Sequence, residues 1–351
     1  MKYTCIDSFS GAGGLSLGLH QAGFDVIYSF DIDSHCIETL NANQKFDKHV
    51  SECADINNLL NGNILKKTGL KRGELFLMAG GPPCQGFSIQ RRGSDEDPRD
   101  ELVLKYAQLV NETYPFFFIM ENVSGLQGHR GKAILGQLIS ELEKIGYNVR
   151  KNLIDAEEYG VPQRRKRIII VGERKDLGNS YEFPKPVPGK VTVRETIGFL
   201  PEPPLDGSDD PEYSLHRRDR LSKLNLKRIN SITEGQGRDN LPKELLAKCH
   251  RVSSDKIGYR NVYGRMSWDD VAPTITARFD SFTRGLFGHP DQPRSITLRE
   301  GALLQTFPID YKFLGTKVEI AKQIGNAVPP KLAKKLGQSI IECYLRDIHG
   351  N

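Results

Sequence analysis

Short apolar runs alternate with amphipathic stretches along the first half of the chain. Uninterrupted apolar runs predict buried strands, and apolar positions at helical spacing between them predict covering helices. The runs expected as strands are 4–7, 26–30, 75–78, 116–120 and 168–171, and helices are expected at 101–113 and 133–145. This alternation predicts an α/β fold built on an open sheet.

A glycine-rich turn, residues 8–14, follows the first predicted strand and precedes a helical pattern. Glycines let a ligand approach the backbone at the start of a helix, where free N–H groups favour an anionic group. Ser16 stands where a dinucleotide fingerprint would have its last glycine, so nicotinamide binding is not preferred. Asp31, about 20 residues further on, is placed to bind a ribose hydroxyl pair.

A third strand is expected to end just before Asp55 and Ile56. Asp55 could accept a hydrogen bond from an adenine amino group while Ile56 packs on the ring. An ordinary helix cap at Asp55 is an equally good interpretation of the local sequence.

The loop 80–88 follows the apolar run 75–78, which places Cys84 at the carboxyl end of a strand. Open α/β sheets bind ligands at that edge. Two prolines make the loop rigid before the thiol, and Gly86 leaves room after it. A buried structural cysteine is the alternative, but a polar, glycine-flanked loop favours a reactive one. The polar stretch 90–99 is expected to be a mobile lid.

Glu121 comes directly after the apolar run 116–120, so we expect it to be partly desolvated and able to share a proton with a substrate. A surface carboxylate is the alternative. Further on, alternation at the start of the run 168–171 is expected to put Gln163, Arg165 and Arg167 on one face. That face could surround a ligand or a phosphate.

Composition sets outer limits. The 351 residues suffice for a large domain and a smaller one, and seven of the nineteen prolines lie in 184–211, which marks the exit from the first domain. No apolar run approaches the ~20 residues of a membrane span, and no signal peptide is recognisable, so a cytoplasmic protein is expected. Six cysteines without a C-x-x-C pair indicate neither a zinc site nor disulfides.

Charge is unevenly distributed. Residues 216–265 contain thirteen Lys or Arg and five Asp or Glu, whereas the whole chain has a net charge of only +5. Such a segment suits a polyanion, with an ordinary solvated surface as the alternative.

Six motifs in order resemble those of the DNA (cytosine-5)-methyltransferases. The resemblance spans nearly the whole chain, and only about 180–265 matches no motif, where the family keeps its variable target recognition region. The matching segments are 9–14 (FSGAGG), 81–88 (GPPCQGFS), 121–123 (ENV), 163–167 (QRRKR), 294–300 (RSITLRE) and 323–330 (QIGNAVPP).

The resemblance implies a Rossmann-like, S-adenosylmethionine-dependent methyltransferase sheet with a second, smaller target recognition domain. The expected division is 1–179 with 319–351 for the catalytic and cofactor-binding domain, and 180–318 for the target recognition domain and hinge. It implies methyl transfer to C5 of a flipped-out cytosine in a short duplex DNA sequence, through a covalent bond between Cys84 and C6. No metal is required.

The resemblance also implies individual roles. Catalytic roles fall to Cys84, Glu121, Arg165 and Arg167, and substrate contacts to Gln85, Ser88, Asn122 and Gln163. Cofactor contacts fall to Phe9, Gly11, Gly13, Asp31, Ile32, Asp55, Ile56, Pro82, Leu102, Asn326 and Val328. The family often has Glu where Asp31 stands and an aromatic residue where Ile32 stands.

The closest alternative is a transfer-RNA cytosine-5 methyltransferase of the same architecture, but Gly86, Phe87 and Ser88 favour DNA. A binding-only protein would be expected to lack Cys84, Glu121 or the arginines, and all of these are present. The chain resembles minimal bacterial or phage enzymes of restriction-modification systems, which implies a monomer and allows a cognate endonuclease that acts on the same sequence.

Overall fold

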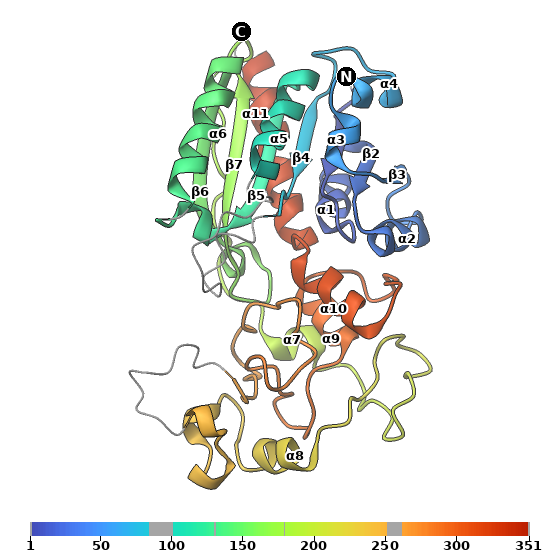
Figure 1. Cartoon of the computed structure of the whole chain (residues 1–351), viewed down its shortest axis with the longest axis vertical. Helices are drawn as coiled ribbons and strands as arrows, with labels where there is room; N and C mark the ends of the chain where they lie inside the picture. The colour runs from blue at the N-terminus through green and yellow to red at the C-terminus, as the bar shows by residue number, and fades with distance from the viewer. Residues whose placement is uncertain (1, 84–100, 130, 179, 251–261, 350–351) are drawn as a thin grey trace. The chain divides into compact units, whose positions relative to one another are not determined.

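The computed structural model describes residues 2–83, 101–129, 131–178, 180–250 and 262–349 (Figure 1). These residues form a seven-stranded sheet in the order β3-β2-β1-β4-β5-β7-β6. The strands are β1 (Thr4–Ser8), β2 (Asp25–Asp31), β3 (Val50–Cys53), β4 (Leu77–Gly80), β5 (Phe117–Val123), β6 (Tyr147–Asp155) and β7 (Lys166–Arg174). All neighbours are parallel except β7, which runs antiparallel to both β5 and β6.

Helices cover both faces of this sheet. The helix α5 packs beside α6 on one face, and α1 packs against α11 on the other (Figure 1). The helices of this part are α1 (Gly14–Ala22), α2 (Ser34–Ala42), α3 (Ile56–Leu59), α4 (Asn63–Thr68), α5 (Glu101–Thr113), α6 (Lys132–Ile145) and α11 (Pro330–His349), with 3₁₀ turns η3 (Ser124–Gln127) and η4 (Ala156–Tyr159). The α/β fold class predicted from the apolar runs is confirmed.

Burial explains which strands the sequence revealed. All four residues of β4 are buried, as are the first four of β5, because parallel strands with helices on both faces have no polar side. The edge strand β6 was not predicted. Its middle residues Arg150, Lys151 and Asn152 are exposed, and charged residues on an edge strand prevent pairing with other chains.

The carboxyl-terminal helix lies very close to α1. A methyl group at Gly18 would lie 2.3 Å from the carbonyl oxygen of Pro330 and 2.4 Å from Cβ of Ala333. Only glycine permits this approach, which joins the last helix to the first.

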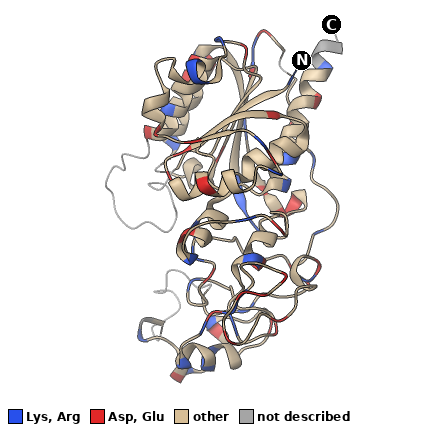
Figure 2. Cartoon of the chain, turned by 90° about the vertical axis from the view of Figure 1, so that its right-hand side faces the viewer, with Lys and Arg blue, Asp and Glu red and all other residues tan. Residues whose placement is uncertain are grey.

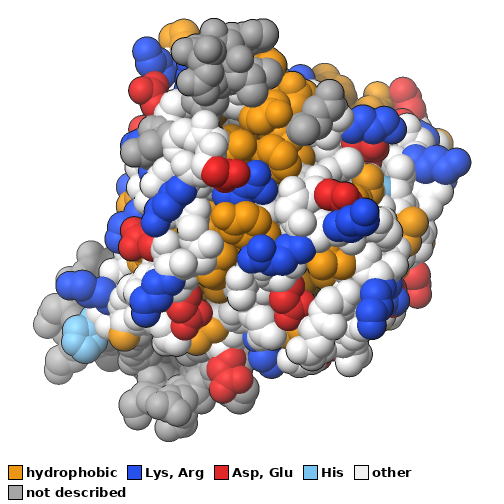
Figure 3. Space-filling view, turned by 90° about the horizontal axis from the view of Figure 1, so that it is seen from above, with side chains coloured by type: hydrophobic (Ala, Val, Ile, Leu, Met, Phe, Trp, Pro, Cys, Tyr) orange, Lys and Arg blue, Asp and Glu red, His pale blue; other side chains and the backbone are white. Residues whose placement is uncertain are grey.

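Aromatic rings gather at the amino-terminal ends of the parallel strands. Phe76 lies 4.8 Å from Tyr3, 5.7 Å from Phe116 and 5.0 Å from Tyr344, measured between ring centroids. Figure 3 views this end of the molecule and shows hydrophobic side chains bordered by Lys, Arg, Asp and Glu. The opposite edge, where the strands end, carries the polar residues of the predicted site.

The chain divides into two compact units. The first comprises 1–159, 166–187 and 327–351 and contains the sheet, and the second comprises 160–165 and 188–326. Helices of the second unit are α7 (Val193–Ile197), α8 (Lys223–Asn230), α9 (Leu298–Leu304) and α10 (Lys317–Asn326), with 3₁₀ turns η5 (Arg238–Asn240), η6 (Lys243–Leu245) and η7 (Lys248–His250). The predicted division into a catalytic domain and a target recognition domain stays a prediction.

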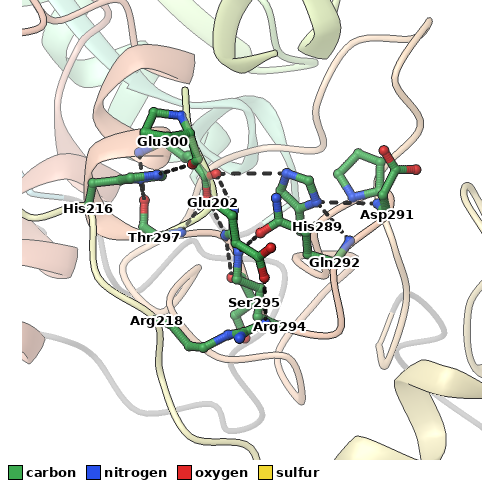
Figure 4. Close-up of polar contacts among 12 residues, drawn as sticks. Glu202, His216, Arg218, His289, Asp291, Gln292, Arg294, Ser295, Thr297 and Glu300 are labelled. Atoms are coloured by element: carbon green, nitrogen blue, oxygen red, sulfur yellow. Dashed lines mark hydrogen bonds and ion pairs between the residues drawn. The ribbon is translucent and has the colours of Figure 1, made fainter. Parts of the chain in front are cut away.

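A buried polar network fixes the second unit around the start of α9 (Figure 4). Arg294 donates two hydrogen bonds to Glu300, over 2.8 and 2.7 Å, and each side chain is 1% exposed. Thr297 caps α9 and contacts His216 over 3.0 Å, and His289 lies 3.9 Å from Glu300. The motif at 294–300 therefore acts as an internal framework.

None of the described helices is both long enough and apolar enough to cross a membrane.

Candidate active site

The glycine turn after β1 is fixed by one carboxylate. Phe9, Gly11 and Gly13 have positive φ angles of 56°, 50° and 85°. The N–H of Gly11 donates to Oδ2 of Asp31 over 2.9 Å, and the N–H of Asp33 donates to Oδ1 over 2.9 Å. No described atom beyond the chain neighbours lies within 4 Å of a methyl group placed at Gly11. The turn is therefore firmly held yet open to a ligand.

The other predicted cofactor residues differ in exposure. Ile32 is 70% exposed beside Asp31, whereas Ile56 is 2% exposed and packs in the main core. Asp55 caps α3, with Oδ1 accepting from the backbone N–H and the side-chain amide of Asn57, each over 2.8 Å. Leu102, in the first turn of α5, packs partly buried against the same core.

The start of the cysteine loop is anchored to β5. The side-chain amide of Asn122 donates to the carbonyl oxygen of Pro82 over 3.0 Å, and its own oxygen accepts from the N–H of Val123 over 2.8 Å. A methyl group at Gly81 would lie 3.7 Å from Oε2 of Glu121. The loop thus leaves the sheet directly beside this carboxylate. Cys84, Gln85, Ser88 and the predicted lid 90–99 lie outside the described residues.

Glu121 and Arg167 form an ion pair at the same edge. Oε1 of Glu121 lies 2.9 Å from Nε of Arg167, and the side chains are 12% and 15% exposed. In the antiparallel pair of β5 and β7, Arg167 is opposite Val123, which places Glu121 diagonally across from it. A largely desolvated acceptor and donor therefore lie side by side near Gly81.

Gln163 is fully buried in the second unit. Its Nε2 donates to the carbonyl oxygen of Leu304 over 2.9 Å and to Oε1 of Gln305 over 2.7 Å, and its Oε1 accepts from the N–H of Ile275 over 3.0 Å. Both ends of the amide thus hold other segments of this unit together.

Arg165 has a similar position. It is 1% exposed and donates to the carbonyl oxygens of Ile275 and Gly325 over 3.0 and 3.1 Å. The expectation that Gln163, Arg165 and Arg167 share a strand face was wrong, because β7 begins at Lys166. Of the closing motif, Asn326 is the exposed last residue of α10 in the second unit and Val328 is buried in the first.

Asp7 is a residue at this edge that the motif pattern did not identify. It is fully buried in β1, and its Oδ2 accepts from the N–H and hydroxyl of Ser16 over 3.0 and 2.5 Å. Its Oδ1 has no hydrogen-bond partner among the described residues. Burial raises the pKa of Asp7 to about 7, while the hydrogen bonds from Ser16 oppose this rise. An aspartate inside an apolar strand, directly before a glycine turn, was the available signal.

Within the described residues, no three His, Cys, Asp or Glu side chains form a group that could hold a metal ion.

The sheet order with one reversed strand, the glycine turn and the acidic residue ending β2 define a Rossmann-like methyltransferase, a class whose members depend on S-adenosylmethionine.

Comparison with known proteins narrows this class. The family model described as C-5 cytosine-specific DNA methylase matches residues 3–342. The type II methylase M.HgiDII of Herpetosiphon aurantiacus is 34% identical, over 98% of this chain and 96% of its own length. The chain therefore belongs to the C-5 cytosine-specific DNA methylases, and it is a DNA (cytosine-5)-methyltransferase.

Solved structures agree with this assignment. A crystal structure described as a DNA modification methyltransferase encoded within a prophage of Escherichia coli has a TM-score of 0.75 and 27% identity, over 97% of this chain and 99% of that one. The DNMT2 of Spodoptera frugiperda has a TM-score of 0.64 over 97% of this chain and all of its own. At 16% identity it shows a shared fold alone.

Proposed function

We propose that this chain methylates C5 of a cytosine within a short sequence of duplex DNA, through a covalent intermediate between Cys84 and C6 of the base. The observation that carries the proposal is the ion pair of Glu121 and Arg167, 2.9 Å apart, beside the start of the cysteine loop. A carboxyl group and a guanidinium in one place suit the polar edge of a cytosine ring.

The residues at the carboxyl edge of the sheet fit S-adenosylmethionine. The open space at Gly11 would admit the methionine part, Asp31 would accept from the ribose hydroxyls, and the exposed Ile32 would pack on the adenine. Asp55, Pro82, Leu102, Asn326 and Val328 stay predicted contacts, with Phe9 and Gly13. The buried side chain of Ile56 would act through the core rather than by direct stacking.

Cytosine C5 is a poor nucleophile until a group adds at C6. The Cys84 thiolate would form the bond to C6 while Glu121 protonates or hydrogen-bonds N3 and accepts from the 4-amino group, and Arg167 would donate to O2. S-adenosylmethionine supplies the electrophilic methyl group. C5 would bond to that methyl group as the methyl–sulfur bond breaks, a base would remove the C5 proton, and that electron pair would restore the C5=C6 bond and release the Cys84 thiolate.

The remaining predicted residues divide into two groups. Gln85 and Ser88 are proposed to contact the substrate from the cysteine loop, whereas Asn122 would position that loop through Pro82. Gln163 and Arg165 would act by holding the second unit in shape, because both side chains are buried and engaged there.

The target cytosine has to leave the base stack to reach Cys84, at a cost of a few kcal/mol that is offset by contacts in the pocket. The relatives named as type II methyltransferases support a role in a restriction-modification system. We propose duplex DNA as the partner and the monomer as the working form, with a cognate endonuclease as a further partner.

Bisulfite sequencing of genomic DNA tests the proposal. A bacterial host without cytosine methylation would express the wild type or Cys84→Ser, and we expect protected cytosines in one short sequence context with the wild type alone. Unmarked DNA from a folded wild type that binds S-adenosylmethionine would overturn it and favour transfer RNA, which the same chemistry on purified RNA would then reveal.

A further inference from the structure

The segment 217–230 of the second unit has an exposed basic surface, and its helix α8 is held by core packing and by hydrogen bonds at both ends. Arg217, Arg220, Lys223 and Lys227 are all exposed, and none has an ion-pair or hydrogen-bond partner for its side chain among the described residues. Figure 2 shows the Lys and Arg positions in blue, several of them at the lower end of the chain as drawn.

Two other exposed arginines of this unit are neutralised by acids. Arg164 pairs with Asp270 over 2.5 Å, and Arg194 pairs with Asp269 over 2.7 Å. Asp219 is the only acid among residues 217–233, and Lys317 pairs with it. The four cations therefore have no acidic partner among the described residues, and their combined positive field favours an anionic partner.

The helix α8 directs two of these charges to one side. Four of its exposed residues, Lys223, Leu226, Lys227 and Asn230, are spaced three and four residues apart, so they form one outward stripe, and the exposed Leu224 lies beside Lys223 in the sequence. Leu226 is 41% exposed, whereas the apolar Ile229 on the same helix is buried. The outward stripe is thus amphipathic and positively charged.

The inward side of α8 is fixed by packing and by a buried arginine. Ile229 is fully buried with Ile232, Leu241 and Phe282 in a small separate core. Arg265 donates to the carbonyl oxygens of Ile229 and Ile232, over 3.0 and 3.1 Å, and so caps the carboxyl end of the helix.

The same guanidinium reaches the buried network. Arg265 also donates to the carbonyl oxygens of His289 and Gln292, each over 2.7 Å. At the other end of α8, Ser222 accepts from the N–H of Asn225 over 3.3 Å. Both ends of the helix are therefore held, and the cations stand on a rigid element.

We propose that the outward stripe of α8, with Arg217 and Arg220 before it, holds the phosphate backbone of the substrate duplex. The inference rests on the proposed function, since it assumes that duplex DNA is the polyanion. Arg217, Arg220, Lys223 and Lys227 bind phosphate oxygens, and the capped helix keeps them in register with the strand. These contacts position the DNA without reading its sequence.

The test compares Lys223→Ala/Lys227→Ala with Lys66→Ala/Lys144→Ala. The control lysines are exposed on α4 and α6 of the first unit, also lack ion-pair partners among the described residues, and give the same change in net charge. Binding of a labelled duplex that carries the methylated sequence, and of a scrambled duplex, is followed by fluorescence anisotropy across a salt series.

We expect the slope of log Kd against log salt to fall by about 1 for each lysine removed from α8, equally for both duplexes. The control pair should keep the wild-type slope. The proposal is overturned by an unchanged slope in the α8 variant, or by an equal fall in the control. A wild type that marks DNA in the bisulfite experiment keeps the proposed function even if this surface is wrong.

A second pair of substitutions guards against an effect of folding. Arg217 and Arg220 lie outside α8, so replacing both with alanine leaves the helix and the contacts that hold it unchanged. We expect the same fall in the slope of log Kd against log salt. A fall in the α8 variant alone, accompanied by a lower unfolding midpoint, would contradict direct contact with phosphate.

Discussion

At the scale of single residues, two carboxylates at the carboxyl edge of the sheet, Asp31 and Asp7, differ in their surroundings. Asp31 uses both oxygens to fix the backbone at Gly11 and Asp33. Asp7 is fully buried beside the same turn, and its carboxylate accepts hydrogen bonds only from Ser16 among the described residues. One carboxylate is thus placed to meet a ligand and the other to support the turn.

We predict that Asp31→Asn weakens binding of S-adenosylmethionine by about 10- to 100-fold. The amide would present a donor to an N–H and lose a charge-assisted hydrogen bond, worth about 1.5–3 kcal/mol. Isothermal titration calorimetry of the folded variant measures this, and Asp31→Glu serves as the control, with a loss smaller than that of Asn. Equal affinity of Asp31→Asn and the wild type would remove Asp31 from the cofactor site.

At the scale of elements, buried arginines connect the helices α8 and α9 to irregular segments of the second unit. The second unit has few strands or long helices among its described residues, so buried arginines supply the missing hydrogen bonds. Arg265 connects α8 to the segment at His289, and Arg294 connects that segment to Glu300 in α9. Arginine suits this use because its planar group carries five donors.

We predict that Arg265→Lys lowers the free energy of unfolding of the second unit by about 2–4 kcal/mol. Lysine can satisfy only part of this set of carbonyls, and each unsatisfied buried group costs about 1–3 kcal/mol. Urea unfolding measures the loss, with Arg194→Lys as the matched control. Arg194 makes an exposed pair with Asp269, so its replacement should change stability little. Equal losses in both variants would show that Arg265 is not a cap.

At the scale of the whole molecule, the two units respond to acid in opposite directions. Burial raises the pKa of Asp7 to about 7 in the first unit. In the second unit, burial is the main cause that lowers the pKa of His289 to about 4, while Glu300 and Asp291 oppose this fall and Arg294 and Arg265 add to it. Burial also opposes ionisation of Glu300, but Arg294 outweighs this and lowers its pKa to about 2.

The signs follow from proton binding in the folded and unfolded states. Asp7 holds its proton more tightly when folded, so its effect on stability improves as pH falls from about 7 to 4. His289 holds its proton less tightly when folded, chiefly because it is buried, and its Nδ1 already accepts from the N–H groups of Asp291 and Gln292. Its contribution is complete above pH 6.5 and is lost as pH falls towards 4.

We therefore predict that the second unit becomes less stable between pH 6.5 and 4, by at most about 3 kcal/mol from His289. Trp268 is the single tryptophan, lies in this unit and contacts His289 at 5.1 Å between ring centroids, so its fluorescence reports on this unit. Urea unfolding at several pH values measures the loss. His289→Gln should flatten the profile over this range, and a wild-type midpoint that does not move would contradict the assignment.

The sequence by itself determined the sheet strands that are buried on both faces, because an apolar run needs no partner to be recognised. It also predicted that two acidic residues, Asp31 and Glu121, lie at the carboxyl ends of strands, whereas their roles stay predictions. Glu121 lies inside β5 rather than after it, a shift too small to move it from the carboxyl edge.

Tertiary structure alone decided which polar residues meet. Glu121 and Arg167 pair only through the register of β5 and β7, and Gln163 and Arg165 turn inward because β7 begins after them. The sequence pattern likewise predicted neither the exposed strand β6 nor the capping of α8 by Arg265. Each depends on groups distant in sequence, and a local pattern records the burial of a residue but not the identity of the partner that satisfies it.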